Sequence, residues 1–260
     1  MNRVLITGGN GMLGRVLTAP LIEAGYTVRV SSRSPRSPKA RSDVEWAQAS
    51  LETGEGLVEA VDDVAVIIHC ATSPSKLKQV DIEGTRRLLE LSRQQAVKHF
   101  MYISIIGVDK IPYNLFQAKY KAEESIKASG VPYTILRAPQ FYQAIEIVLK
   151  AFTKPPIGLM PKGFPFQPMD VTEVAEHMVD LVKAGPSGHV PDIAGPRTYE
   201  LTDLARTWLQ AQGKRKPLLQ IPFVGKFAAA MRAGYGTAPD KATNGLTWED
   251  WLQRQYGTGS

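Results

Sequence analysis

The chain has 260 residues, of which 43% are hydrophobic, and carries a formal net charge of +6. This composition excludes a largely disordered chain, and no apolar run reaches the roughly 18–20 residues that cross a bilayer. A single cysteine, Cys70, excludes an intramolecular disulfide framework. Since Asn2 and Arg3 lead directly into a strand, we expect no secretory signal and a cytoplasmic protein.

Positive charge is scattered among acidic residues, and its densest groups are residues 33–41 and 214–216. Neither group forms the long basic stripe with interleaved aromatic side chains that is typical of nucleic-acid binding. A modest positive charge favours solubility or a small anionic ligand instead. We therefore expect a small-molecule substrate, no nucleic acid and no membrane as partners, and a monomer or homodimer.

Strand-like and helix-like patterns alternate through the first 150 residues. Apolar or alternating runs predict strands at residues 3–7, 26–31, 44–47, 64–70, 100–104 and 133–136. Amphipathic spacing predicts helices at residues 12–24, 54–60, 78–95 and 116–129. This alternation is typical of parallel strands joined by helical crossovers, so we expect a Rossmann-type, doubly wound α/β sheet.

The composition changes after about residue 150, where Pro and Gly become frequent. Residues 171–183 and 202–212 keep helical spacing. We expect a principal domain at residues 1–150 and a smaller α+β substrate lobe at residues 151–260, with a possible return of the chain to the main sheet.

Glycines follow the first predicted strand at a regular spacing, as Gly8-x-x-Gly11-x-x-Gly14. Between a strand and a helix, such glycines allow a tight turn, close approach of a pyrophosphate and close helix packing. The N–H groups and dipole of the helix then hold the negative charge. The alternative is a tight turn without a ligand, but the strand–turn–helix context favours a dinucleotide.

The end of the second predicted strand bears on which dinucleotide binds. NAD-binding sheets usually carry an acidic residue there for the ribose 2′-hydroxyl, whereas this chain has Ser31, Ser32 and Arg33. A guanidinium suits the 2′-phosphate of NADP, so we favour NADP(H) as the cofactor. The alternative is that Arg33 is a solvated loop charge.

Several later segments together resemble the atypical short-chain dehydrogenase/reductases, and among them the NmrA-like family. They are residues 102–109 (YISIIGVD), 130–137 (GVPYTILR), 170–175 (DVTEVA) and 246–252 (LTWEDWL), with Ala118-Lys119 in a predicted helix. The resemblance covers nearly the whole chain. It implies an NADP-binding Rossmann domain with a small C-terminal lobe over the nicotinamide.

The resemblance also places residues around the cofactor. Ala71 and Thr72 would line it after the fourth strand, Ser104 would lie beside the nicotinamide, and Pro139 and Phe141 would follow the sixth strand. At Ser50 many relatives carry an aspartate that contacts adenine. The candidate cofactor-binding residues are therefore Gly8, Asn10, Gly11, Met12, Leu13, Gly14, Arg33, Ser50, Ala71, Thr72, Ser104, Lys119, Pro139 and Phe141.

The Tyr-x-x-x-Lys pair of most short-chain reductases is absent, because Leu115 stands four residues before Lys119. Phe116 to Lys119 instead resembles the Phe-x-x-Lys of isoflavone reductase-like relatives, in which the lysine is the proposed acid/base. Lys119 and Ser104 are the candidate catalytic residues. The alternative is that Lys119 only holds the nicotinamide ribose.

Other reactive side chains fit structural roles better. His69 and Cys70 end an apolar strand, which is typical of packed core residues. His99, His177 and His189 share no spacing with each other or with acidic residues, so we expect no metal.

Two functions remain open. The first is an NADPH-dependent oxidoreductase that reduces a small carbonyl, quinone or related acceptor by hydride transfer. The second is a non-catalytic NADP(H)-binding redox sensor or regulator of the NmrA-like type. The missing tyrosine favours the second, and the aromatic residues of the later lobe favour the first.

Overall fold

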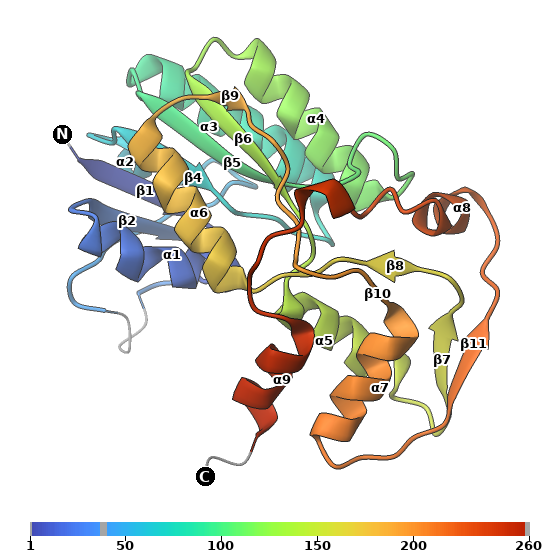
Figure 1. Ribbon diagram of the computed structural model, residues 1–260. Helices are drawn as coiled ribbons and strands as arrows, with labels where there is room; N and C mark the ends of the chain where they lie inside the picture. Colours follow the sequence, from blue (N-terminus) through green and yellow to red (C-terminus); the bar gives the residue numbers. More distant parts are fainter. Residues whose placement is uncertain (1, 37–40, 258–260) are drawn as a thin grey trace. The chain divides into compact units, whose positions relative to one another are not determined.

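The computed structural model describes residues 2–36 and 41–257 (Figure 1). Within these ranges, no helix has both the length and the hydropathy that crossing a bilayer requires. The described residues divide into two compact units that are interleaved along the chain. The first unit contains residues 2–36, 41–104, 114–137 and 174–191, and the second contains residues 105–113, 138–173 and 192–257.

The first unit is built on a parallel sheet that has seven strands in the described residues, in the order β3-β2-β1-β4-β5-β6-β9. Strand order reverses at β1, which has β2 on one side and β4 on the other. This arrangement confirms the predicted doubly wound α/β fold. The strands are β1 (Arg3–Thr7), β2 (Thr27–Ser32), β3 (Glu45–Gln48), β4 (Val66–His69), β5 (His99–Ile105), β6 (Tyr133–Ala138) and β9 (Gly188–His189).

Helices cover both faces of this sheet, with α1 and α6 on one face and α3 and α4 on the other (Figure 1). This coverage explains why β1 is a continuous apolar run, since Val4, Leu5 and Ile6 are fully buried. The helices are α1 (Met12–Glu23), α2 (Leu57–Val61), α3 (Thr85–Gln94), α4 (Asn114–Ala128) and α6 (Val171–Ala184).

The segment expected to be one long helix at residues 78–95 has two parts. Lys78–Gly84 is π-helical and runs directly into α3. The wider turn contains Asp81, which is 2% exposed and has its carboxylate bonded to Thr72 and Ser73. Apolar spacing does not distinguish a π-helical turn from the α-helix that continues it.

The second unit has its own core. The rings of Trp248 and Trp251 stack at 5.0 Å, and Tyr142 packs against both. The Tyr142 hydroxyl donates to the Leu246 carbonyl at 2.6 Å, which satisfies the one polar group of this buried side chain. The elements are α5 (Tyr142–Phe152), β7 (Gly158–Pro161), β8 (Pro165–Phe166), β10 (Tyr199–Glu200), α7 (Leu201–Ala211), β11 (Leu218–Ile221), α8 (Lys226–Arg232), a 3₁₀ turn at Pro239–Lys241 and α9 (Trp248–Tyr256).

Short strands complete this unit. β10 pairs with β8 antiparallel, and β11 pairs with β7 in parallel. Helix α9 begins with a capping box, in which Thr247 and Asp250 satisfy each other's backbone N–H groups. The two units are distinguished by their internal contacts and not by independent folding. The division into domains expected at residue 150 therefore stays a prediction.

Candidate functional site

The carboxyl ends of the central strands meet at one edge of the sheet. In the ladder, Thr7 of β1 pairs with Ser31 of β2 and with His69 of β4, and His69 pairs with Tyr102 of β5. The segments that follow these residues therefore lie side by side where the strand order reverses. In doubly wound sheets, ligands bind at such a reversal.

The glycine loop lies closely against this edge. Gly8 has φ +69°, and a Cβ there would come within 2.8 Å of the Ala71 backbone. At Gly9 a Cβ would collide with Val30, and at Gly14 it would lie 2.5 Å from the Gly8 carbonyl oxygen. Among the described residues, a Cβ at Gly11 would meet the Gly8 oxygen alone, at 3.0 Å. Three glycines therefore pack the loop, and the exposed fourth leaves room for a ligand.

Helix α1 opens directly from this loop with Gly11 at its N-cap. Considering only the part of the chain that the structure describes, no side chain caps the helix and no acidic residue stands in its first turn. The N–H groups of Met12 and Leu13 consequently have no intrahelical acceptor, and the helix dipole adds positive potential. This cradle fits the pyrophosphate of a dinucleotide.

Three other predicted contact residues follow the first three strands of the chain. The Asn10 amide donates to the Ser32 hydroxyl at 3.0 Å, which ties the loop to the end of β2. Arg33 is exposed immediately after β2, and the Gln48 amide donates to its carbonyl. The Ser50 hydroxyl accepts from the Thr53 N–H at 3.2 Å, so it shapes the turn after β3. Contacts of these residues with a nucleotide stay predictions.

Buried hydrogen bonds fix His69, which ends β4. Its Nδ1 lies 2.6 Å from the Thr7 hydroxyl and its Nε2 lies 2.9 Å from the Thr85 hydroxyl. Because the Thr85 hydroxyl donates its proton to the Asp81 carbonyl, Nε2 must carry the imidazole proton. Complete burial lowers the pKa of His69 to about 3. A structural role, as expected from sequence, therefore fits this residue.

The loop after β4 is held by Asp81, a residue that the sequence analysis missed. The Thr72 hydroxyl donates to one Asp81 carboxylate oxygen at 2.5 Å, and the Ser73 N–H donates to the other at 2.9 Å. Ala71 precedes Thr72 in sequence, and its backbone packs closely against Gly8 of the glycine loop. Burial raises the pKa of the neighbouring Cys70 thiol to about 12, which leaves it protonated and unreactive.

Lys119 extends from α4 to the end of β5 and is 5% exposed. Its Nζ donates to the Ile103 carbonyl at 3.1 Å and lies 5.0 Å from the centre of the Tyr102 ring. Within residues 2–36 and 41–257, its ammonium group forms no salt bridge with a carboxylate. Burial lowers the pKa of Lys119, although the charges of Asp81, Cys70 and Glu123 oppose that shift.

One helical turn after Lys119, Glu123 forms a fully buried ion pair that the sequence analysis also missed. Arg137 of β6 donates to both Glu123 carboxylate oxygens, at 2.9 and 2.7 Å. The Ser104 hydroxyl donates to the same carboxylate at 2.5 Å. Ser104 is therefore anchored to α4 through its only proton, and its predicted catalytic part stays a prediction.

Pro139 and Phe141, the last two predicted cofactor contacts, belong to the second unit. Phe141 forms an isolated parallel bridge with Met169, whose carbonyl accepts from the Tyr142 N–H.

The structure also bears on metal binding. Among the residues that the structure describes, no group of three or more His, Cys, Asp or Glu could hold a metal ion.

Comparison with known proteins gives relatives of this fold. The photosystem II assembly factor Ycf39 of Cyanophora paradoxa is 25% identical over 233 residues, which cover 84% of this chain and 71% of that protein. The Ycf39 protein of Trieres chinensis is 33% identical over 151 residues, 55% of this chain and 47% of that protein.

Solved structures share the architecture at lower identity. The NADPH-dependent quinone oxidoreductase QOR2 of Escherichia coli, in complex with NADPH, superposes with a TM-score of 0.81 at 17% identity. The superposition covers 98% of this chain and all of that one. A nucleoside-diphosphate-sugar epimerase of Staphylococcus aureus gives a TM-score of 0.78 at 18% identity, over 97% of this chain and all of that one.

A protein-family model described as NAD(P)H-binding matches residues 8–183, from the glycine loop through α6. This match spans well over half of the chain, and it confirms the resemblance to the NmrA-like, atypical short-chain dehydrogenase/reductases. The chain therefore belongs to the NAD(P)H-binding family.

Proposed function

We propose that this protein is an NADPH-dependent oxidoreductase that reduces a small carbonyl, quinone or related acceptor by hydride transfer. The observation that carries the catalytic part of this proposal is Lys119. A buried ammonium group with a lowered pKa stands at the carboxyl end of β5, where a ligand of this sheet is expected. The similarity in fold to an NADPH-dependent quinone oxidoreductase supports it.

The preference for NADPH rests on the end of β2. The exposed Arg33 follows Ser32, and an acidic residue is absent from residues 27–34. A guanidinium donates paired hydrogen bonds to a phosphate, whereas a carboxylate at that place would repel it. The uncapped N-terminus of α1 holds the pyrophosphate in the same proposal, with Gly11 closest to it.

Bound NADPH supplies the hydride. Lys119 uses one N–H on the Ile103 carbonyl, which leaves two N–H groups for the nicotinamide ribose and for the acceptor oxygen. Lys119 would donate a proton from its ammonium group to the acceptor oxygen, as that oxygen gains an electron pair on reduction. Solvent then reprotonates the neutral amine. A lowered pKa makes this proton transfer easier near neutral pH.

A second function is favoured by a specific observation, which is the missing tyrosine one helical turn before Lys119. Leu115 lies one helical turn before it on α4, and the Ser104 proton is given to Glu123. Without the tyrosine of the Tyr-x-x-x-Lys pair, the site suits a non-catalytic redox sensor or regulator that binds NADP(H). The sequence similarity to Ycf39, an assembly factor by its name, supports this alternative.

We also propose that the protein works in the reducing cytoplasm. Cys70 is its only cysteine, so no disulfide can form within the chain, which fits a compartment where thiols stay reduced. A monomer or a homodimer is compatible with this proposal.

The experiment that separates the two functions is NADPH consumption with a panel of quinones and aldehydes. We expect turnover with at least one acceptor, and Lys119→Ala should lower kcat about a hundredfold, since general acid catalysis contributes roughly 10²–10⁴. Lys121→Ala is the matched control, because Lys121 is exposed on the same helix. Saturable NADPH binding without turnover of any acceptor would contradict the enzyme and favour the sensor.

A further inference from the structure

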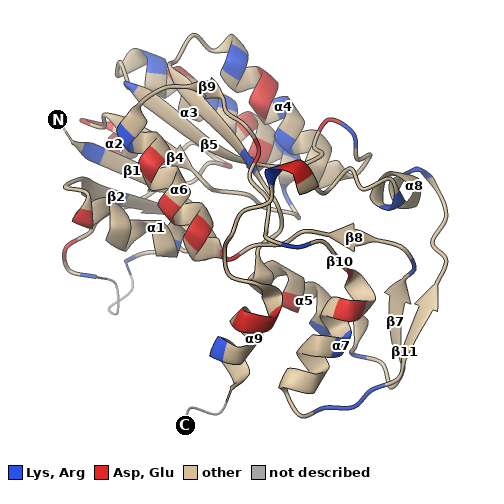
Figure 2. Cartoon of the chain, viewed as in Figure 1, with Lys and Arg blue, Asp and Glu red and all other residues tan. Residues whose placement is uncertain are grey.

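Two stretches of the second unit carry basic residues and no acidic ones, and the carboxylates of Glu200 and Asp203 contact them from outside, at Gln220 and Arg206. Residues 153–165 and 204–239 contain no Asp or Glu. Figure 2 shows β7, β11 and α8 without an acidic segment. The basic residues of these two stretches are Lys154, Lys162, Arg206, Lys214, Arg215, Lys216, Lys226 and Arg232.

The same region exposes large apolar side chains. Leu219 of β11 and its ladder partner Leu159 of β7 are 54% and 39% exposed, whereas Met160 on the opposite side of β7 is fully buried. Between β11 and α8, Val224 is 90% exposed, and Phe223 precedes it at 38%. We call these two stretches, with their exposed apolar and basic side chains, the basic apolar face.

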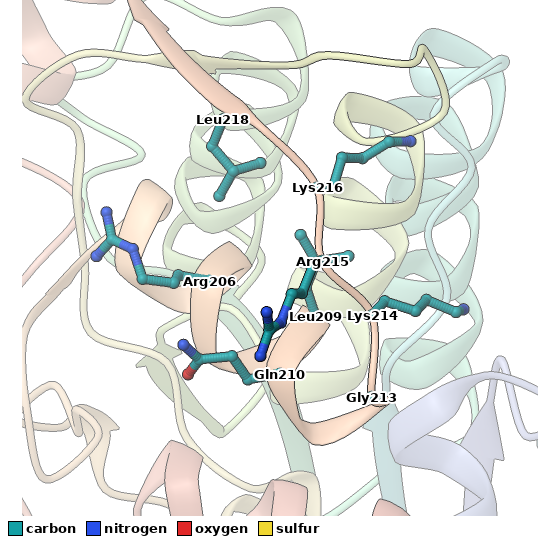
Figure 3. Close-up of a pocket in the computed structure, with 8 residues that line it drawn as sticks. All are labelled: Arg206, Leu209, Gln210, Gly213, Lys214, Arg215, Lys216 and Leu218. Carbon is teal, nitrogen blue, oxygen red and sulfur yellow. The ribbon is translucent and has the colours of Figure 1, made fainter.

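A pocket of about 690 Å³ lies at one end of this face, lined by residues of α7 and of the segment that leads into β11 (Figure 3). Lys214 and Lys216 point to one side of that segment, and Arg206 and Arg215 lie on its other side (Figure 3). Arg206 already pairs with Asp203, and Lys216 donates to the Thr153 carbonyl. Because these cations point to both sides of the segment, they do not converge on one small anion, and each side on its own can face an extended anionic surface.

We propose that the basic apolar face adsorbs to an anionic lipid bilayer, with Val224 and the Leu159–Leu219 pair in the interface and the lysines and arginines against lipid phosphates. Burial of apolar side chains and attraction to anionic lipid act together in such adsorption. Nucleic acid fits less well, because the two most exposed apolar side chains, Val224 and Leu219, cannot stack on bases, whereas the aromatic residues of this face are at most 43% exposed. A second copy of the same face would bring like charges together.

This inference goes beyond the proposed function and changes one expectation from sequence. The lack of a spanning segment led us to expect no membrane partner, and the described residues contain no spanning helix. Adsorption requires a surface rather than a helix that crosses the bilayer. The sequence analysis named residues 214–216 as one of the two densest basic groups and set it aside because it forms no long basic stripe.

Flotation with lipid vesicles tests the proposal. The whole protein is mixed with vesicles of neutral phosphatidylcholine, or with vesicles in which about a third of the lipid is phosphatidylglycerol, at low and at high salt. We expect binding to the anionic vesicles that high salt weakens. The triple substitution Lys214→Gln/Arg215→Gln/Lys216→Gln should weaken it about a hundredfold, since each basic residue near the surface contributes about fivefold.

Matched variants separate this face from general charge. Lys78→Gln/Lys98→Gln/Lys121→Gln removes the same net charge from exposed positions of the first unit and should leave binding unchanged within about twofold. Leu219→Glu/Val224→Glu should abolish binding, whereas Val58→Glu, at a residue 54% exposed in the first unit, should not.

Three results would overturn the proposal. The first is equal flotation, or none, with both kinds of vesicle. The second is binding that Leu219→Glu/Val224→Glu retains, which would assign the face to a polyanion such as a nucleic acid. The third is an absence of flotation together with an oligomeric state, measured by light scattering, that the same variant changes, which would assign the face to a second copy.

Discussion

The two units use charged residues in opposite ways. At the strand edge of the first unit, Asp81, Lys119 and Glu123 are buried, and each has a defined partner. In the second unit, the basic apolar face exposes its charges to solvent. Buried polar networks fix one geometry at a cost in desolvation, whereas exposed charges set long-range attraction and contribute little to folding. The first arrangement suits chemistry on a bound cofactor, and the second suits docking.

The largest expected effect tests whether buried charge holds the first unit together. Glu123→Gln removes the buried carboxylate that accepts hydrogen bonds from Arg137 and Ser104, which should lower the free energy of unfolding by about 3–5 kcal/mol. Its neighbour Glu124, paired with Lys127 at the surface, is the control, and Glu124→Gln should change stability by at most about 0.5 kcal/mol. If denaturant titrations gave similar losses in the free energy of unfolding for both variants, the buried ion pair would be no more important to stability than the exposed one.

The second prediction uses the two buried histidines of the first unit. Burial lowers the pKa of His69 to about 3 and of His99 to about 4, below the unfolded value of 6.5. As the pH falls below 6.5, these histidines become protonated in the unfolded chain before they do in the folded protein. The free energy of unfolding therefore decreases with falling pH until the pH reaches the pKa values of the folded protein. By pH 5.5 the two residues together should reduce the free energy of unfolding by about 3 kcal/mol.

His99→Gln identifies the share of one residue in this dependence. Glutamine keeps a donor toward the Thr134 hydroxyl and cannot titrate. Urea denaturation of the variant between pH 5.5 and 8 should show about half of the histidine contribution. An unchanged pH dependence would show that His99 is as easily protonated in the folded protein as in the unfolded chain.

The third prediction concerns the glycine loop. Gly11→Val should weaken NADPH binding about ten- to hundredfold, because the added side chain occupies ligand space at a cost of about 1–3 kcal/mol. Gly9→Val is the contrasting variant, since its Cβ would collide with Val30 and lower the melting temperature instead. Calorimetric affinity that Gly11→Val leaves unaltered would contradict the placement of the pyrophosphate.

The smallest expected effect concerns the 2′-phosphate. Arg33→Ala should weaken NADPH binding about tenfold and NADH binding less than twofold, because NADH has no phosphate for the guanidinium to contact. Arg36→Ala is a matched control three residues further on, where the guanidinium donates to the Arg41 carbonyl. If Arg33→Ala weakened the binding of NADPH and NADH equally, Arg33 would be a solvated loop charge.

Sequence reasoning predicted the parts of the fold that depend on local pattern. Periodicity gave β1, β2, β4, β5 and β6 to within a few residues, and the glycine spacing located the loop at the edge of the sheet. Helix α5 was missed, although Tyr142, Ile145 and Leu149 carry helical spacing and are buried. The neighbouring Pro139 and the aromatic residues around it suggested a loop instead.

The polar network could not be predicted from one sequence. Glu123 and Arg137 lie 14 residues apart on different elements, and their pairing depends on how α4 packs beside β6. Asp81 looked like the polar face of an amphipathic helix, because spacing alone cannot distinguish an exposed carboxylate from one held by Thr72. Contacts between distant elements define both features, and periodicity within one element carries no record of them.

The central claim is that the loops at the carboxyl ends of the central strands, which begin with the glycine loop at Gly8, bind NADP(H). Isothermal titration of the unmodified protein with NADPH and with NADH, under identical buffer and salt, tests it most directly. We predict saturable binding of both nucleotides at a single site, with NADPH the tighter. A titration without saturable binding of either nucleotide, at concentrations up to the millimolar range, would contradict the account.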